Sequence, residues 1–140
     1  MTTILSDAKI QQLLDEVKPL PTRWQQLRTP TAHGHSDSLC ASISVTGGNG
    51  SNFKLYARHN PLNHMDFSII LTVLDSGGGE QRLLRYNGKH PSKHTNHIEK
   101  ESFKNEFHIH FATERYQRDG RPIDGYAKIT TKYATFEEAL

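Results

Sequence analysis

The sequence predicts an α+β fold, with an N-terminal helix packed on an antiparallel sheet of about six strands and a short C-terminal helix. Apolar residues repeat with helical spacing near the start of the chain, whereas later segments mostly alternate apolar and polar residues, as strands do. Short turns join most of these segments, and short connections favour antiparallel neighbours. A chain of 140 residues is long enough to bury the core of a single domain, residues 1–140.

The first helix is expected to begin after Ser6, a residue type that caps helices, and to run to about Lys18. Four apolar residues fall at positions i, i+3, i+4 and i+7 and form one stripe: Ile10, Leu13, Leu14 and Val17. Pro19 ends the helix, and residues 21–38 are expected to form an extended segment or loop.

Six later segments have strand-like patterns: residues 39–45, 53–58, 65–74, 81–86, 107–116 and 126–133. The segment 65–74 is apolar on both faces, which places it in the middle of the sheet. Within the connection 91–106, residues 96–104 are expected to form a short helix. Thr135 and Glu138 make a capping box that opens the C-terminal helix.

The composition is that of a globular protein, with 34% hydrophobic residues, 23% charged residues and a formal net charge of +2. The single cysteine, Cys40, excludes an internal disulfide and a cysteine-rich zinc site. The chain begins without a signal-peptide pattern, and no apolar run approaches the ~20 residues that a membrane span needs. We therefore expect a cytoplasmic protein.

Histidines concentrate late in the chain, where five of the nine fall close together: His90, His94, His97, His108 and His110. In the segment Phe107–Phe111 they alternate with apolar residues, so His108 and His110 leave one face of the strand and three apolar side chains leave the other. Arg85 is expected at the end of the preceding strand. These residues predict a site on the histidine face.

Positive charge concentrates in residues 82–104, which hold six lysines and arginines against two glutamates, a net +4. Such a run forms either a solvated surface or a patch that faces phosphates. On the second interpretation, five residues are candidates for binding nucleic acid: Arg82, Lys89, His90, Lys93 and His94.

This combination of residues favours metal-independent cleavage of RNA, with RNA as the partner and no cofactor. RNA is cleaved by its own 2′-hydroxyl if one group removes the hydroxyl proton and another protonates the leaving oxygen, and histidine suits both roles near neutral pH. The catalytic candidates are His108 and His110 as acid and base, and Arg85 as the cation that stabilises charge on phosphorus.

Two other functions fit the same residues. The pattern His108-x-His110-x-x-x-Glu114 resembles the first metal motif of cupins, in which two histidines and a carboxylate hold a metal. The second cupin motif has no counterpart because too little chain follows, so we expect no metal. Alternatively, the basic segment docks on another molecule in a non-enzymatic binding or inhibitory protein, such as an antitoxin-like protein or a phage anti-defence inhibitor.

Short motifs in residues 81–116 resemble small bacterial domains of unknown function, in particular the TumE-type toxins of toxin–antitoxin pairs. These motifs are Arg85-Tyr86-Asn87 at a strand end, the nearby His90 and His94, and the later strand Phe107-His108-Ile109-His110. Asn87 stands where the toxins are expected to have aspartate. The resemblance implies a bacterial cytoplasmic protein from a toxin or defence locus, with a cognate antitoxin as a possible partner.

Overall fold

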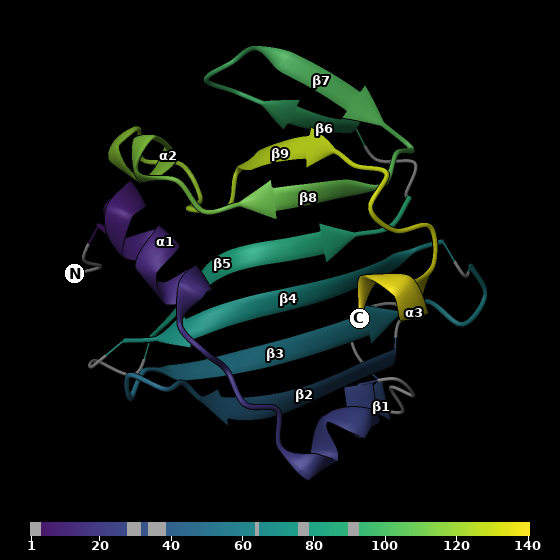
Figure 1. Cartoon of the computed structure of the whole chain (residues 1–140). Coiled ribbons are helices and arrows are strands. Elements are labelled where there is room, and N and C mark those ends of the chain that lie inside the picture. The colour runs from purple at the N-terminus through teal and green to yellow at the C-terminus, as the bar shows by residue number, and fades with distance from the viewer. Residues whose placement is uncertain (1–3, 28–31, 34–38, 64, 76–78, 90–92) are drawn as a thin grey trace.

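The computed structural model describes residues 4–27, 32–33, 39–63, 65–75, 79–89 and 93–140 (Figure 1). Its helices are α1 (Asp7–Asp15), the 3-10 helix η1 (Thr22–Leu27), α2 (Glu114–Arg118) and α3 (Phe136–Ala139). Its strands are β1 (Ala32–His33), β2 (Leu39–Thr46), β3 (Asn52–His59), β4 (Phe67–Leu74), β5 (Glu80–Asn87), β6 (Lys93–Asn96), β7 (Glu101–Lys104), β8 (His108–Phe111) and β9 (Tyr126–Ile129). Among these described residues, no helix is long and apolar enough to cross a membrane.

One antiparallel sheet dominates the fold, with the strand order β1-β2-β3-β4-β5-β8-β9. Six of these strands are four to eight residues long, and β1 has only two. The predicted fold class is therefore confirmed, and β4 lies in the middle of the sheet as its two apolar faces indicated. Strands β6 and β7 form a separate hairpin beside the β8–β9 edge (Figure 1).

The core lies on one face of the sheet, where α1 and α3 pack (Figure 1). Phe53 and Phe67 are fully buried there, and α3 adds Phe136, whose ring meets Phe67 edge-on at 5.9 Å between centroids. Both sequence-predicted caps form. The Ser6 side chain accepts a hydrogen bond from the Lys9 amide, and Thr135 accepts one from Glu138.

Three predicted boundaries were wrong. The first helix ends at Asp15 rather than near Lys18. Strand β8, which carries His108 and His110, ends at Phe111 rather than near Tyr116. It ends there because Thr113 caps the short helix α2, in which the Tyr116 side chain is buried. Strand β9 ends at Ile129 instead of residue 133.

The expected helix at residues 96–104 was also wrong, because this segment belongs to the β6–β7 hairpin. Lys100, in the connection between the two strands, has a positive φ of 59°, which a helix does not allow. The four paired positions of the hairpin place Lys93 opposite Lys104 and His94 opposite Phe103. The hairpin is what brings His94 to the histidines of β8.

Candidate functional site: a cationic cleft beside three histidines

Strand pairing brings the end of β5 against β8, the strand that carries His108 and His110. In this register Arg85 lies opposite His110, and Asn87 lies opposite His108. Both histidines leave the face opposite Ile109, which is only 3% exposed in the core. The alternation seen in the sequence therefore holds for this strand. However, both imidazoles are also well covered, with His108 2% and His110 4% exposed.

His108 is held by a row of hydrogen bonds that crosses four strands. Arg58 donates to the Ser68 hydroxyl at 3.2 Å, and that hydroxyl donates to the Asn87 side-chain oxygen at 2.8 Å. The Asn87 amide lies 3.2 Å from His108 Nε2, while His108 Nδ1 lies 2.7 Å from the carbonyl oxygen of Glu106. Because a carbonyl can only accept, Nδ1 carries the proton and Nε2 accepts from Asn87.

His110 is fixed from its other side. Its Nδ1 lies 2.8 Å from the main-chain oxygen of Asp124 and donates to it, so Nε2 of the neutral ring has a free lone pair. Burial and the nearby Arg85 guanidinium lower the pKa of His110 from 6.5 to about 2. The ring is therefore neutral across the physiological pH range.

The β6–β7 hairpin adds a third imidazole. The His94 ring centroid lies 4.8 Å from that of His110 and 6.0 Å from that of His108, while those two are 5.0 Å apart. Asn96 anchors the hairpin through two hydrogen bonds of 2.8 Å with the main chain of Ala127. These bonds fix Asn96 Oδ1 as an acceptor, so His94 Nε2 donates to it at 2.7 Å.

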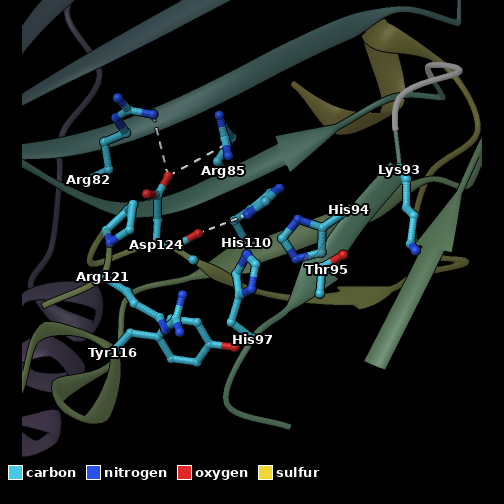
Figure 2. Close-up of a pocket in the computed structure, with 12 residues that line it drawn as sticks. Arg82, Arg85, Lys93, His94, Thr95, His97, His110, Tyr116, Arg121 and Asp124 are labelled. Atoms are coloured by element: carbon cyan, nitrogen blue, oxygen red, sulfur yellow. Dashed lines mark hydrogen bonds and ion pairs between the residues drawn. The ribbon is translucent and has the colours of Figure 1, made fainter. Parts of the chain in front are cut away.

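A cleft of about 460 Å³ opens between β5, the hairpin and the loop before β9 (Figure 2). We call it the histidine cleft; its lining residues are Arg82, Arg85, Lys93, His94, Thr95, His97, His110, Tyr116, Arg121, Pro122, Asp124 and Gly125. Among the described residues, the lining holds four cationic side chains and one carboxylate, a net charge of +3. A cleft lined by one sign of charge concentrates ligands of the other sign.

The carboxylate of Asp124 does not fully neutralise the arginines around it. Its Oδ2 lies 3.6 Å from Arg82 Nη1 and 3.6 Å from Arg85 Nε, which is too long for a hydrogen bond (Figure 2). Among the described residues, both Asp124 Oδ2 and Arg85 Nε are buried without a hydrogen-bond partner. Burial lowers the pKa of Arg85, but an arginine stays charged, so an anion entering the cleft meets a guanidinium that is not fully hydrogen-bonded at Nε.

No protein-family model matches the chain, and no curated protein or solved structure matches it either.

The histidine cleft contains most of the site residues predicted from the sequence. Those that line it together are Arg82, Arg85, Lys93, His94 and His110. His108 is next to His110 on β8 but does not line the cleft. The Lys89 ammonium lies 5.2 Å from the Phe107 ring centroid, outside the lining. The structure does not describe His90.

Sequence reasoning missed several residues that line the cleft, namely His97, Tyr116, Arg121 and Asp124. Asp124 and Gly125 read as a turn in the sequence, and nothing local reveals that the Asp124 main-chain oxygen holds His110. His97 belongs to the group of five histidines late in the sequence, but the sequence predicts no role for it.

The alternative metal set of His108, His110 and Glu114 is not assembled. Strand β8 ends at Phe111, and Glu114 opens α2, where its carboxylate pairs with Arg118 at 2.6 Å. Its other oxygen accepts from the Asp7 amide at 3.4 Å. Among the described residues, no group of three or more histidine, cysteine, aspartate or glutamate side chains is arranged to hold a metal ion.

Mild acid is expected to destabilise the protein through His110. The folded-state pKa is about 2 against 6.5, so below pH 6.5 the unfolded chain binds a proton that the folded chain excludes, and the free energy of unfolding falls. Between pH 6.5 and about 5 the loss should be about 2 kcal/mol. Denaturant titrations of the wild type and His110→Gln at both pH values measure it. A loss of the same size in the variant would contradict this assignment.

Proposed function

We propose that the protein binds RNA through its phosphates in the histidine cleft and cleaves it without a metal ion. The observation that carries the proposal is the combination, in one cleft, of four cationic side chains with His94 and His110. Arginine and lysine bind phosphate, and imidazoles transfer protons. A cleft with this lining suits a phosphodiester better than an uncharged ligand.

The proposed reaction is an internal transfer at phosphorus. The 2′-hydroxyl oxygen attacks the adjacent phosphorus while a base takes the hydroxyl proton. The bond from phosphorus to the 5′-oxygen breaks, and an acid gives that oxygen a proton. The products are a 2′,3′-cyclic phosphate and a 5′-hydroxyl, so one proton is removed and one is supplied in each cleavage.

In this proposal His110 is the base, because its ring is neutral and its Nδ1–H bond to Asp124 leaves Nε2 free to accept. A phosphate bound at Arg85 would offset the positive charge that helps lower the pKa of His110, and so would strengthen the base when RNA is present. Arg85 stabilises the charge that develops on the phosphate oxygens.

His94 is the proposed acid. Its Nε2–H is held by Asn96, so the protonated ring offers Nδ1–H to the leaving oxygen. His108 takes a different part from the one expected from the sequence. Both its nitrogens are engaged, so it supports the neighbouring His110 ring as a positioning residue, with ring centroids 5.0 Å apart.

Binding without cleavage is the second candidate function. It is favoured by the burial of His108 and His110 and by their hydrogen bonds to main-chain oxygens, which are also typical of histidines that only stabilise a fold. A protein of this kind would hold nucleic acid in the same cleft, and His110→Gln would leave its affinity intact.

Salt dependence of RNA binding tests the cleft as the phosphate site. With a 2′-O-methyl oligonucleotide, which cannot be cleaved, Arg82→Ala/Lys93→Ala should reduce the slope of log affinity against log salt by about 1.4, from two contacts at ~0.7 each. Lys89→Ala is the matched control, since Lys89 lies outside the cleft and should leave the slope unchanged. An unchanged slope in the double variant, or an equal change in the control, would contradict the proposal.

A further inference from the structure

The sheet has a second, open face that continues from the histidine cleft. Helices α1 and α3 pack on the core face, and the histidines leave the opposite one. Antiparallel register places Tyr56 beside Ile70 and Ile70 beside Arg85, which is itself opposite His110. These four side chains therefore form one row from β3 to β8, perpendicular to the strands.

A hollow of about 420 Å³ lies on this face, lined by Tyr56, Ile70, Thr72, Glu80 and Arg82. Arg82 also lines the histidine cleft, so the two concavities are contiguous. A second row of side chains runs beside the first on the same face. In it, Lys54 lies opposite Thr72, and Thr72 lies opposite Arg82. We call this surface the Tyr56 hollow.

The Tyr56 hollow combines an aromatic ring, an aliphatic side chain and cations. The Tyr56 hydroxyl donates to the Glu80 carboxylate at 2.7 Å, which holds the ring in place and engages the one acid of the lining. The Lys54 ammonium lies 5.2 Å from the centre of the same ring. Unpaired bases stack on aromatic side chains while lysine and arginine follow the backbone, and this pairing of features is typical of single-strand binding surfaces.

We infer that the Tyr56 hollow binds an unpaired base of a single-stranded RNA whose phosphate occupies the histidine cleft. The inference rests on the proposed function and names its substrate class. The row from His110 to Tyr56 crosses three strand spacings of ~4.8 Å, about 14 Å in all. A dinucleotide that fills the cleft therefore leaves the hollow empty, whereas a longer single strand fills both.

The test compares two non-cleavable 2′-O-methyl RNAs, a dinucleotide and a heptanucleotide. The heptanucleotide should bind more tightly than the dinucleotide. Tyr56→Ala should weaken heptanucleotide binding by about 5- to 150-fold, the range that loss of one base stack produces, and should leave the dinucleotide unaffected. Tyr56→Phe is the matched control, because it keeps the ring.

The remaining outcomes distinguish a failure of the Tyr56 hollow as a base site from a failure of the histidine cleft as the phosphate site. Equal affinities for both lengths, or an equal effect of Tyr56→Ala on both, would overturn the hollow and leave the cleft standing. A heptanucleotide without bases that binds as tightly as the complete one would mean that the surface takes any polyanion, which also overturns it. If neither RNA binds, the proposed function itself is contradicted, and the inference that rests on it is contradicted as well. Melting temperatures of Tyr56→Ala and Tyr56→Phe identify any loss caused by unfolding.

Discussion

Replacing His110 with glutamine is expected to lower the rate of RNA cleavage by about 10²- to 10⁴-fold, the usual contribution of a general base. Glutamine is uncharged, like the neutral imidazole that it replaces, but its amide cannot take a proton from the 2′-hydroxyl. The measurement is the single-turnover rate on an RNA oligonucleotide in the presence of a chelator. Affinity for the 2′-O-methyl analogue should change little, because the phosphate contacts remain.

The matched control is His97→Gln, in which an exposed histidine that lines the same cleft is replaced. Its rate should stay close to that of the wild type, since His97 has no role in the proposed step. If His110→Gln cleaved at the wild-type rate, the base would have to be another residue. If rate and affinity fell by the same factor, His110 would only shape the binding site.

Replacing Arg85 with methionine is expected to lower cleavage by about 10²- to 10³-fold, because charge developing on the phosphate loses a half-buried cation of the cleft. The same change leaves the Asp124 carboxylate buried beside Arg82 alone, so the free energy of unfolding should also fall by about 3–5 kcal/mol. Rates and denaturant titrations of the same samples separate the two effects.

A double variant keeps this prediction testable if Arg85→Met unfolds. Arg85→Met/Asp124→Asn removes both charges, so it should recover most of the lost stability and still fail to cleave. Asp124→Asn alone retains the main-chain oxygen that holds His110, so it should still cleave. Cleavage by the double variant at the rate of Asp124→Asn would show that Arg85 does not act on the phosphate.

Local patterns predicted the sheet well, because strand identity depends on alternation and turn residues within a few positions. The central place of β4 followed from its two apolar faces, and the caps at Ser6 and Thr135 followed from single side chains. The end of β8 could not be predicted in this way, because Tyr116 lies in α2 and its burial depends on contacts with distant parts of the chain. The β6–β7 hairpin could not be predicted from local patterns either, because its position depends on hydrogen bonds between Asn96 and Ala127, 31 residues away.

Some features of the candidate site could likewise be predicted from local patterns, and others could not. The shared face of His108 and His110 and the place of Arg85 at the neighbouring strand could be predicted from period and order alone. The sequence could not predict which of the two histidines faces the cleft, because this depends on how the β6–β7 hairpin covers β8. Asp124 was missed for a related reason: it acts partly through its main-chain oxygen, and main-chain groups leave no trace in a sequence.

The most direct test of the central claim is analysis of the ends that the protein produces. The substrate is a DNA oligonucleotide with one internal ribonucleotide, incubated in chelator with protein purified without a histidine tag. The expected result is one cut, on the 3′ side of the ribonucleotide, giving a 2′,3′-cyclic phosphate and a 5′-hydroxyl by mass spectrometry. An intact substrate, cuts at deoxynucleotides, or 5′-phosphate ends would contradict the proposed chemistry.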